Sequence, residues 1–214
     1  MLTIWLNQVV RYMSAKDQNT EKKILNAAES IFQRKGMDGA RMQEIADEAG
    51  INKAMLHYYY KSKQLLFGAV FIKAFSLLAP QLNAILNDDS TIEIKIRNFA
   101  NNYISFISKH PYIPSFIIME LNKNPDFVLK IKSNPNFPNL KKFNKQVEKE
   151  VENKILKPIN SQQLFMNIIS MCIFPFVASP LVKALLDVND KDYQLLMEAR
   201  KIEIANFIID AIKI

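Results

Sequence analysis

The sequence predicts an all-α protein, because helical periodicity recurs along the chain and no alternating strand pattern of useful length appears. Its 214 residues include only 4 glycines and 9 prolines, too few to punctuate many short strands. Hydrophobic residues make up 49% of the chain and charged residues 23%, which allows a substantial core. The net charge of +7 suits a polyanionic partner but does not by itself identify one.

The first predicted helix begins after Thr20, which can act as its N-cap. An apolar stripe follows at helical spacing, and Gly36 is expected to end the helix. Residues 1–17 read as a disordered or upstream-start extension, of which residues 1–12 are the least certain to be translated. This segment lacks the basic region and cleavage site of a signal peptide, so we expect a cytoplasmic protein.

The stretch "MQEIADEAGINKAMLHYYYKSKQLL", residues 42–66, predicts a helix-turn-helix. A helix over 42–49 ends at Gly50, which tolerates the positive φ of a tight turn. Asn52 is positioned to cap a second helix over 53–59, and Ser62 to cap a longer helix that continues to about Leu78. Such a unit leaves its second helix free to enter a DNA major groove.

Beyond an expected break at Pro80, helical patterns continue to the C-terminus. We expect an N-terminal DNA-binding domain over 18–64 and a larger helical body over 65–214. The body helices are predicted at about 91–109, 112–122, 125–132, 138–154, 161–186 and 192–213. The apolar run 164–186 contains Asn167, Pro175, Pro180 and Lys183, which favours a buried, kinked helix over a membrane span.

The segment "ILNAAESIFQRKGMDGARMQEIADEAGINKAMLHYYYKSKQLLF" resembles the DNA-binding domain of the tetracycline-repressor (TetR) family of transcriptional regulators. The resemblance covers about residues 20–70, and the remainder agrees only in being helical and of suitable length. It implies a three-helix DNA-binding domain and a body that dimerises and often binds a small molecule that weakens DNA binding. His57 and Ala54 depart from the tyrosine and glycine usual there, and Ala40 and Arg41 replace the usual hydroxyl residues that open the second helix.

The DNA-binding candidates divide into backbone and base contacts. The resemblance places Tyr58 against a phosphate. Lys63, in the first turn of its helix, is unfavourable for the helix dipole unless a phosphate docks beside it. The other candidates are Arg41 and Lys61 for the backbone, Asn52, Lys53 and Met55 for base edges, and His57 for either. Tyr59 and Tyr60 are expected to anchor the helix in the core, and Lys61 can equally be an ordinary solvated side chain.

The body is rich in aromatic and sulfur-containing side chains, which suit either an effector cavity or an ordinary helical core. The resemblance favours a small hydrophobic or amphipathic effector. The candidate lining residues are Phe99, Tyr103, Phe106, Phe116, Met119, Glu120, Asn167 and Met171.

The last two predicted helices are apolar over more than one face, so they require burial on two sides. The two-fold packing implied by the resemblance supplies the second side, and it sets two recognition helices at a groove-matched spacing on a palindromic operator. The candidate interface residues are Phe174, Leu195, Ala199, Ile202 and Ile209.

Other functions find less support in the sequence. It contains no Gly-rich phosphate loop, nucleophile motif or paired metal ligands, so we expect neither an enzyme nor a cofactor. Cys172 reads as a small core residue. The prediction is therefore a homodimeric repressor that binds double-stranded DNA and is released by an effector. The alternative is a helical regulator or protein-interaction module that has no small-molecule effector.

Overall fold

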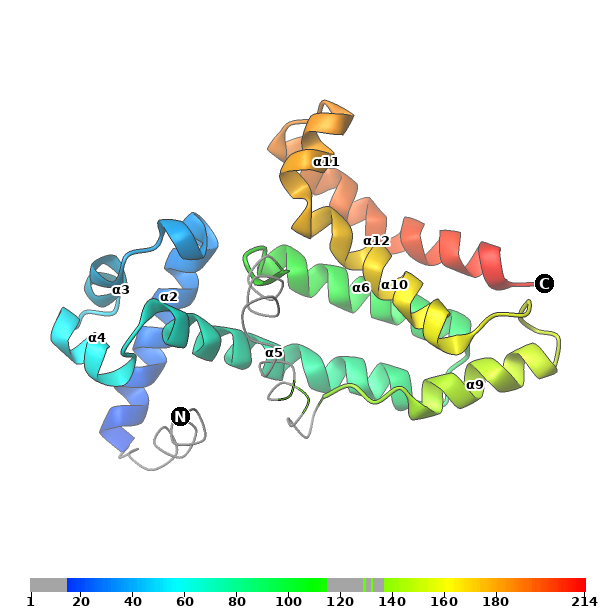
Figure 1. Cartoon of the computed structure of the whole chain (residues 1–214), viewed down its shortest axis with the longest axis horizontal. Coiled ribbons are helices and arrows are strands. Elements are labelled where there is room, and N and C mark those ends of the chain that lie inside the picture. Colours follow the sequence, from blue (N-terminus) through cyan, green and yellow to red (C-terminus); the bar gives the residue numbers. More distant parts are fainter. Residues whose placement is uncertain (1–14, 115–128, 130–131, 133–136) are drawn as a thin grey trace. The chain divides into compact units, whose positions relative to one another are not determined.

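Figure 1 shows a computed structural model of the chain, in which residues 15–114, 129, 132 and 137–214 are described. Regular structure in these residues is entirely α-helical, apart from one isolated bridge between Leu156 and Lys213. The predicted all-α class is therefore confirmed. The predicted extension over 1–12, the helix over 112–122 and the looser stretch over 125–132 fall largely outside the described residues.

Two compact units divide the chain, the first ending at Ala74 and the second beginning at Phe75. The helices of the first unit are α2 (Ala15–Gly39), α3 (Met42–Glu48), α4 (Lys53–Tyr59) and the first half of α5 (Lys63–Asn87). The second unit contains the rest of α5 together with α6 (Ile92–Lys109), α9 (Lys141–Glu152), α10 (Ser161–Val177), α11 (Ser179–Leu186) and α12 (Asp190–Ile212).

The division lies inside α5, later than the boundary after residue 64 that the sequence predicts. The reason is that the first three turns of α5 pack into the N-terminal unit. The rings of Phe67 and Phe32 lie 4.6 Å apart between centroids, and Phe71 is also buried. Further along α5, the Lys73 ammonium pairs with the Glu29 carboxylate of α2 at 2.8 Å.

Helix α2 begins at Ala15, so Thr20 lies inside the helix and is not its N-cap, contrary to the sequence prediction. The predicted stop at Gly36 is a kink: this glycine has φ 66°, and helical turns resume as far as Gly39. A left-handed residue interrupts the hydrogen-bond ladder, and glycine adopts that conformation without a Cβ penalty.

Helix α5 runs through Pro80, where the sequence predicts a break. Proline removes one backbone donor from the helix, at a cost of roughly 3 kcal/mol. The buried residues Leu78, Leu82 and Leu86 lie on one face, on either side of the proline, and belong to the core of the second unit. Their burial at helical spacing offsets the loss, because each fully buried leucine stabilises by ~1.5–3 kcal/mol.

The core of the second unit is centred on α6 and α12, which pack along most of their lengths. Ile96, Phe99 and Ile104 of α6 are buried in the same cluster as Ile204 and Ile208 of α12. Helices α9 and α10 close the cluster with Phe143, Val147, Leu164, Ile168 and Cys172. The predicted core role of Cys172 is confirmed, and burial raises the pKa of its thiol to about 12.

The predicted single helix over 161–186 is two helices, α10 and α11, bent by 80° at the break. Pro175 has no N–H, so it leaves the carbonyl of Met171 without its helical donor. The guanidinium of Arg200 on α12 fills that place, with Nη2 donating at 2.9 Å and Nε at 3.2 Å. The Tyr193 hydroxyl donates to the Pro175 carbonyl at 2.6 Å. The bend is therefore held by α12.

One helix in the described residues, α5, is long and apolar enough to cross a bilayer by length and composition, and 44% of its most apolar window is buried. The bent pair α10 and α11 passes the same test only if both are counted as one span. The buried face of α5 supplies residues to the cores of both units, which is the behaviour of a core helix.

Candidate nucleic-acid interface

Helices α3 and α4 are joined by a tight turn that has the predicted helix-turn-helix geometry. Gly50 adopts φ 68°, and the Ile51 N–H donates to the Ala46 carbonyl at 3.0 Å. The small side chain of Ala46 is fully buried, together with Ile45 and Leu56. The turn therefore fixes α4 against α3 through apolar contacts on one face and leaves the opposite face uncovered.

Replacing Gly50 by alanine tests the conformational origin of this turn. A Cβ at Gly50 meets no atom within 4 Å, so the cost arises from the left-handed backbone alone. We expect Gly50→Ala to destabilise the N-terminal unit by about 1 kcal/mol, and Gly50→Asn by less, because asparagine tolerates this conformation. Thermal unfolding followed by circular dichroism measures both. Equal losses in the two variants would contradict the explanation.

The predicted cap of α4 is confirmed, and it changes what Asn52 can offer to DNA. Its Oδ1 accepts a hydrogen bond from the Met55 backbone N–H at 2.7 Å. That oxygen already accepts one hydrogen bond within the protein, whereas the amide nitrogen has both of its N–H groups to offer to a base. Asn52 is exposed at the N-terminal end of α4.

The uncovered face of α4 carries most of the predicted DNA contacts. Tyr58 is 75% exposed, and Met55 is 43% exposed even though its neighbour Leu56 is fully buried. Lys53, His57 and Lys61 are also exposed. The face therefore presents ammonium groups, an imidazole, a phenol and a thioether from one short helix segment, which is a suitable set for phosphates and base edges.

Behind this face, Tyr60 anchors the end of α4, as the sequence predicts. It is buried, and its hydroxyl donates to Glu21 Oε1 of α2 at 2.8 Å. Burial and the neighbouring Glu21 carboxylate both raise the pKa of Tyr60, so the phenol stays neutral. Tyr59 is half-buried, and its ring packs edge-on against Tyr58 with 5.7 Å between centroids. The exposed tyrosine is thus supported by a partly buried one.

Arg41 is the N-cap residue of α3, and its side chain makes no capping hydrogen bond. Glu44 stabilises this helix start instead. The Lys35 ammonium donates to its carboxylate at 2.9 Å, which lowers the pKa of Glu44, and Arg41 contributes in the same direction. A negative charge in the first turn favours the helix dipole. The Arg41 side chain remains exposed beside α3, as expected of a phosphate contact.

Lys63 has a role within the protein that the sequence prediction missed. Its ammonium donates to the carbonyls of Asp38 at 3.2 Å and Ala40 at 3.0 Å, at the end of α2. These contacts explain the position of the lysine without a docked phosphate, because they tie α5 to the end of α2. Local residue spacing could not predict this contact, because the two carbonyls lie 23–25 residues before Lys63 in the sequence.

Four of the five described effector-pocket candidates belong to one core cluster or pack against it. Phe99 is buried in the core, and Tyr103 stacks on it with 5.4 Å between ring centroids. Phe106 and Met171 are half-buried against the same cluster. Burial raises the pKa of Tyr103. Asn167 is exposed, and in the described residues it does not line a buried cavity, contrary to the prediction. Phe116, Met119 and Glu120 lie outside the described residues.

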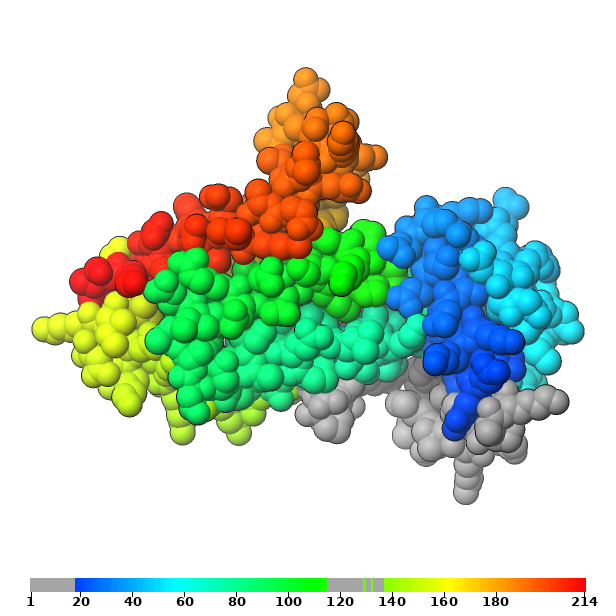
Figure 2. All heavy atoms as spheres, turned by 180° about the vertical axis from the view of Figure 1, so that it is seen from behind, coloured from blue at the N-terminus to red at the C-terminus, as the bar shows by residue number. Residues whose placement is uncertain are grey.

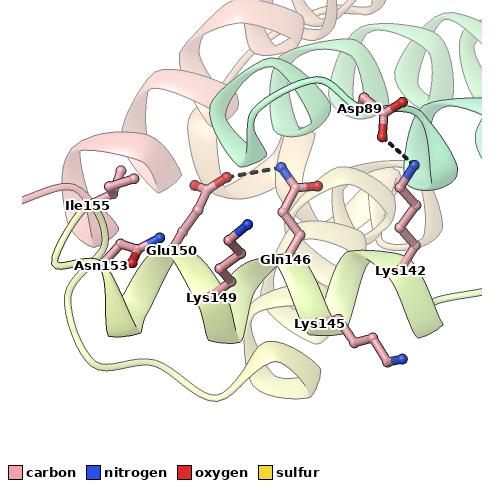
Figure 3. Close-up of a pocket in the computed structure, with 8 residues that line it drawn as sticks. All are labelled: Asp89, Lys142, Lys145, Gln146, Lys149, Glu150, Asn153 and Ile155. Atoms are coloured by element: carbon pink, nitrogen blue, oxygen red, sulfur yellow. Dashed lines mark hydrogen bonds and ion pairs between the residues drawn. The ribbon is translucent and has the colours of Figure 1, made fainter.

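A groove of about 430 Å³ runs along α9, away from those candidates (Figure 3). Lys142 pairs with Asp89 at 2.6 Å, and Gln146 donates to Glu150 at 3.0 Å. In Figure 3 the Lys149 side chain points toward the other lining residues and the Lys145 side chain points away from them. The groove is open and its lining is charged, which agrees with the predicted solvated face of α9.

The predicted dimer-interface residues are mostly exposed in the single chain. Ile202 is 64% exposed and Leu195 62%, and Ala199 lies between them on the same face of α12. Phe174 of α10 is also exposed. Ile209 is the exception and was wrongly assigned, because it is 4% exposed and packs in the core of its own unit.

Comparisons with known proteins agree with the geometry of α3 and α4. Residues 24–70, which span the helix-turn-helix, match the family described as "Bacterial regulatory proteins, tetR family". This segment is a DNA-binding domain of the TetR family. Within the matched residues lie α3, α4 and the first turns of α5.

Relatives of this TetR-family chain are named as transcriptional regulators. It is 30% identical over 111 residues to the HTH-type transcriptional regulator RutR of Escherichia coli strain K12, covering 52% of this chain and 50% of that protein. It is 30% identical over 109 residues to the HTH-type transcriptional repressor SCO4008 of Streptomyces coelicolor, covering 50% and 53%. The chain thus spans about half the length of the curated relatives it matches.

Solved structures extend the similarity of fold to the body. A mutant form of HlyIIR has a TM-score of 0.61 at 24% identity, covering 92% of this chain and 98% of that one. The TetR-family regulator PfmR from Thermus thermophilus has a TM-score of 0.57 at 17% identity, covering 72% and 84%. At these identities the likeness establishes the fold of the body and not its ligand.

Proposed function

We propose that this TetR-family regulator is a homodimer that binds a palindromic operator through α4 and is released from it by a small hydrophobic or amphipathic effector. The observation that carries the DNA-binding part is the exposed face of α4, held by buried Leu56 and Tyr60 and lined by Lys53, His57 and Tyr58. Side chains from the N-terminal part of such a helix reach base edges when the helix lies in the major groove.

Roles within this face follow from side-chain chemistry. Lys53 and Met55 are the base-edge residues, since an ammonium donates to guanine and a thioether packs on a thymine methyl. Tyr58 donates its hydroxyl to a phosphate, and Arg41 and Lys61 add positive charge to the backbone contact. Lys63 supports the interface indirectly, because its ammonium already binds two carbonyls at the end of α2.

The dimer rests on the exposed apolar residues of α10 and α12. Ile202, Leu195 and Phe207 of α12 are all more than 60% exposed, and Phe174 of α10 is 57% exposed. Contiguous exposed apolar surface of this kind marks an interaction site. Two-fold packing of these helices presents two copies of α4 to two half-sites of a palindrome.

The effector acts on this dimer through α5, which supplies buried residues to both units and is the only covalent connection between them. The half-buried Tyr103, Phe106 and Met171 are the lining candidates that remain among the described residues. An effector lowers DNA affinity only by its differential affinity for the two spacings of the DNA-binding units.

The DNA-binding proposal is tested with DNA fragments obtained by random-site selection, titrated with salt. We expect Lys53→Gln to reduce the magnitude of the slope of log affinity against log salt concentration by about 2, because one cation leaves each of the two half-sites that the dimer contacts. Tyr58→Phe should weaken binding by about tenfold or more at unchanged slope, since it removes a hydrogen bond to a charged phosphate without removing a cation.

Lys191→Gln is the matched control, because Lys191 is an exposed lysine in the first turn of α12. It should leave both affinity and slope unchanged. Lys63→Ala is unsuitable as a phosphate test, since losing its two carbonyl contacts also disturbs the fold. A wild-type dimer that selects no sequence, or equal slopes for Lys53→Gln and Lys191→Gln, would refute the assigned face.

A further inference from the structure

Helix α11 contributes no buried residue to its own chain. None of its eight residues is buried, and Leu181, Leu185 and Leu186 are 58%, 75% and 53% exposed. Together with Val182 they occupy positions i, i+1, i+4 and i+5, which form one stripe along the helix. Figure 2 shows these residues, in orange, as a lobe that stands clear of the other described atoms of its unit. A bare leucine stripe on a helix this short requires a partner surface.

The direction of α11 is fixed by specific contacts at both of its ends. At its start, α12 holds the bend through Tyr193 on the Pro175 carbonyl and Arg200 on the Met171 carbonyl. At its end, Asp187 adopts φ 52° and the Lys183 ammonium pairs with Asp190 at 2.6 Å. The leucine stripe is therefore presented in a defined orientation, as a preformed binding element is.

The charges around the stripe select the kind of partner. Lys183 is the only charged residue within α11, and it is already paired with Asp190. Asp187 and Asp192 are exposed close to the end of the helix. Lys191 is exposed beside Asp192, so the surroundings of the stripe carry no excess of the cations that anionic lipid headgroups and nucleic acid require. The surface therefore suits a protein.

The apolar surface of α11 is continuous along the chain with the proposed dimer surface. It follows directly after exposed Phe174 on α10 and precedes exposed Leu195 and Leu196 on α12. A two-fold partner that covers α10 and α12 therefore reaches the same neighbourhood. Resting on the homodimer proposed above, we propose that α11 is an arm whose leucine stripe packs on a second copy of this chain and strengthens the dimer.

The test measures the dimer dissociation constant of the full chain by sedimentation equilibrium. We expect Leu181→Glu/Leu185→Glu to raise this constant by about 100-fold or more, because each dimer would lose four buried leucines. Ile94→Glu, which places the same charge on an exposed isoleucine in the first turn of α6, should leave the constant unchanged. Unchanged helical circular dichroism confirms that the variants are folded.

A second variant tests the contact that holds the bend between α10 and α11. Tyr193→Phe removes the hydroxyl that holds the Pro175 carbonyl, so it should weaken the dimer by less than the leucine pair does. A dimer whose dissociation constant is the same in wild type and the leucine variant overturns the arm and leaves the proposed function intact. A wild type that is monomeric at every concentration overturns the proposed homodimer itself.

Discussion

Replacing Ile202 by glutamate is expected to convert the proposed dimer to monomers and to weaken operator binding strongly. Ile202 is 64% exposed in the single chain and lies two turns from the exposed Leu195 on the same face of α12. The two-fold axis places two copies of residue 202 in one interface, where two unpaired carboxylates would lose water and repel each other. Each buried charge without a partner costs several kcal/mol, about the strength of a typical dimer.

Size-exclusion chromatography with light scattering measures the mass, and salt-titrated DNA binding measures the consequence. A monomer presents one copy of α4 and so contacts one half-site, which should lower operator affinity by about 100-fold or more relative to the dimer. Ile94→Glu is again the control, because it introduces the same charge at an exposed isoleucine on α6. A variant that stays dimeric with full DNA affinity would place the interface elsewhere.

Replacing Asp88 by asparagine is expected to destabilise the body more than any other surface substitution considered. Lys95 of α6 is 1% exposed, and its ammonium donates to the Asp88 carboxylate at 2.7 Å and to the carbonyls of Ile85 and Asp88 at 3.0 and 2.9 Å. This lysine closes the C-terminal end of α5, where carbonyls lack helical donors. Asp88→Asn leaves the buried charge of Lys95 without a counter-ion.

The expected loss is about 2 kcal/mol at neutral pH, below the ~3–5 kcal/mol of a fully buried pair, because Asp88 is partly exposed and the two carbonyls remain. Lys95→Met should cost about 1 kcal/mol, since it removes the charge itself and keeps the apolar stem. Urea unfolding of the two variants measures both losses in the free energy of unfolding and shows which is larger. The neighbouring Asp89→Asn, whose carboxylate pairs with Lys142 at the surface, should change the midpoint little.

The same pair predicts how stability depends on pH. Burial acts to raise the pKa of Asp88, but hydrogen bonds from Lys95 and Ser90 outweigh it and hold the pKa at about 2, below the ordinary 3.8. A carboxyl group with a lowered pKa in the folded state stabilises fully above its unfolded pKa and loses that contribution as the pH falls toward its folded pKa. The difference between wild type and Asp88→Asn should therefore shrink between about pH 4 and pH 2. A constant difference over that range would contradict the assignment.

Local sequence patterns were sufficient for the recognition unit. Gly50 at its positive φ, Asn52 as the cap of α4 and Tyr60 as a buried anchor all depend on interactions within a few tens of residues, and each is where the pattern predicts. Helix α6 was equally accessible, at about residues 91–109, because an apolar stripe at helical spacing is a local signal. The same signals indicated which helices carry exposed apolar faces.

Tertiary structure decided the features that depend on contacts between distant residues. Helix α5 passes through Pro80 because leucines on either side of it are buried in one core. The chain bends by 80° between α10 and α11, where Tyr193 and Arg200 of α12 bind carbonyls of α10. Lys63 and Lys95 bind carbonyls at the ends of other helices. Periodicity reports which face of a helix is apolar, but not which partner covers it, because packing between distant segments overrides local preference.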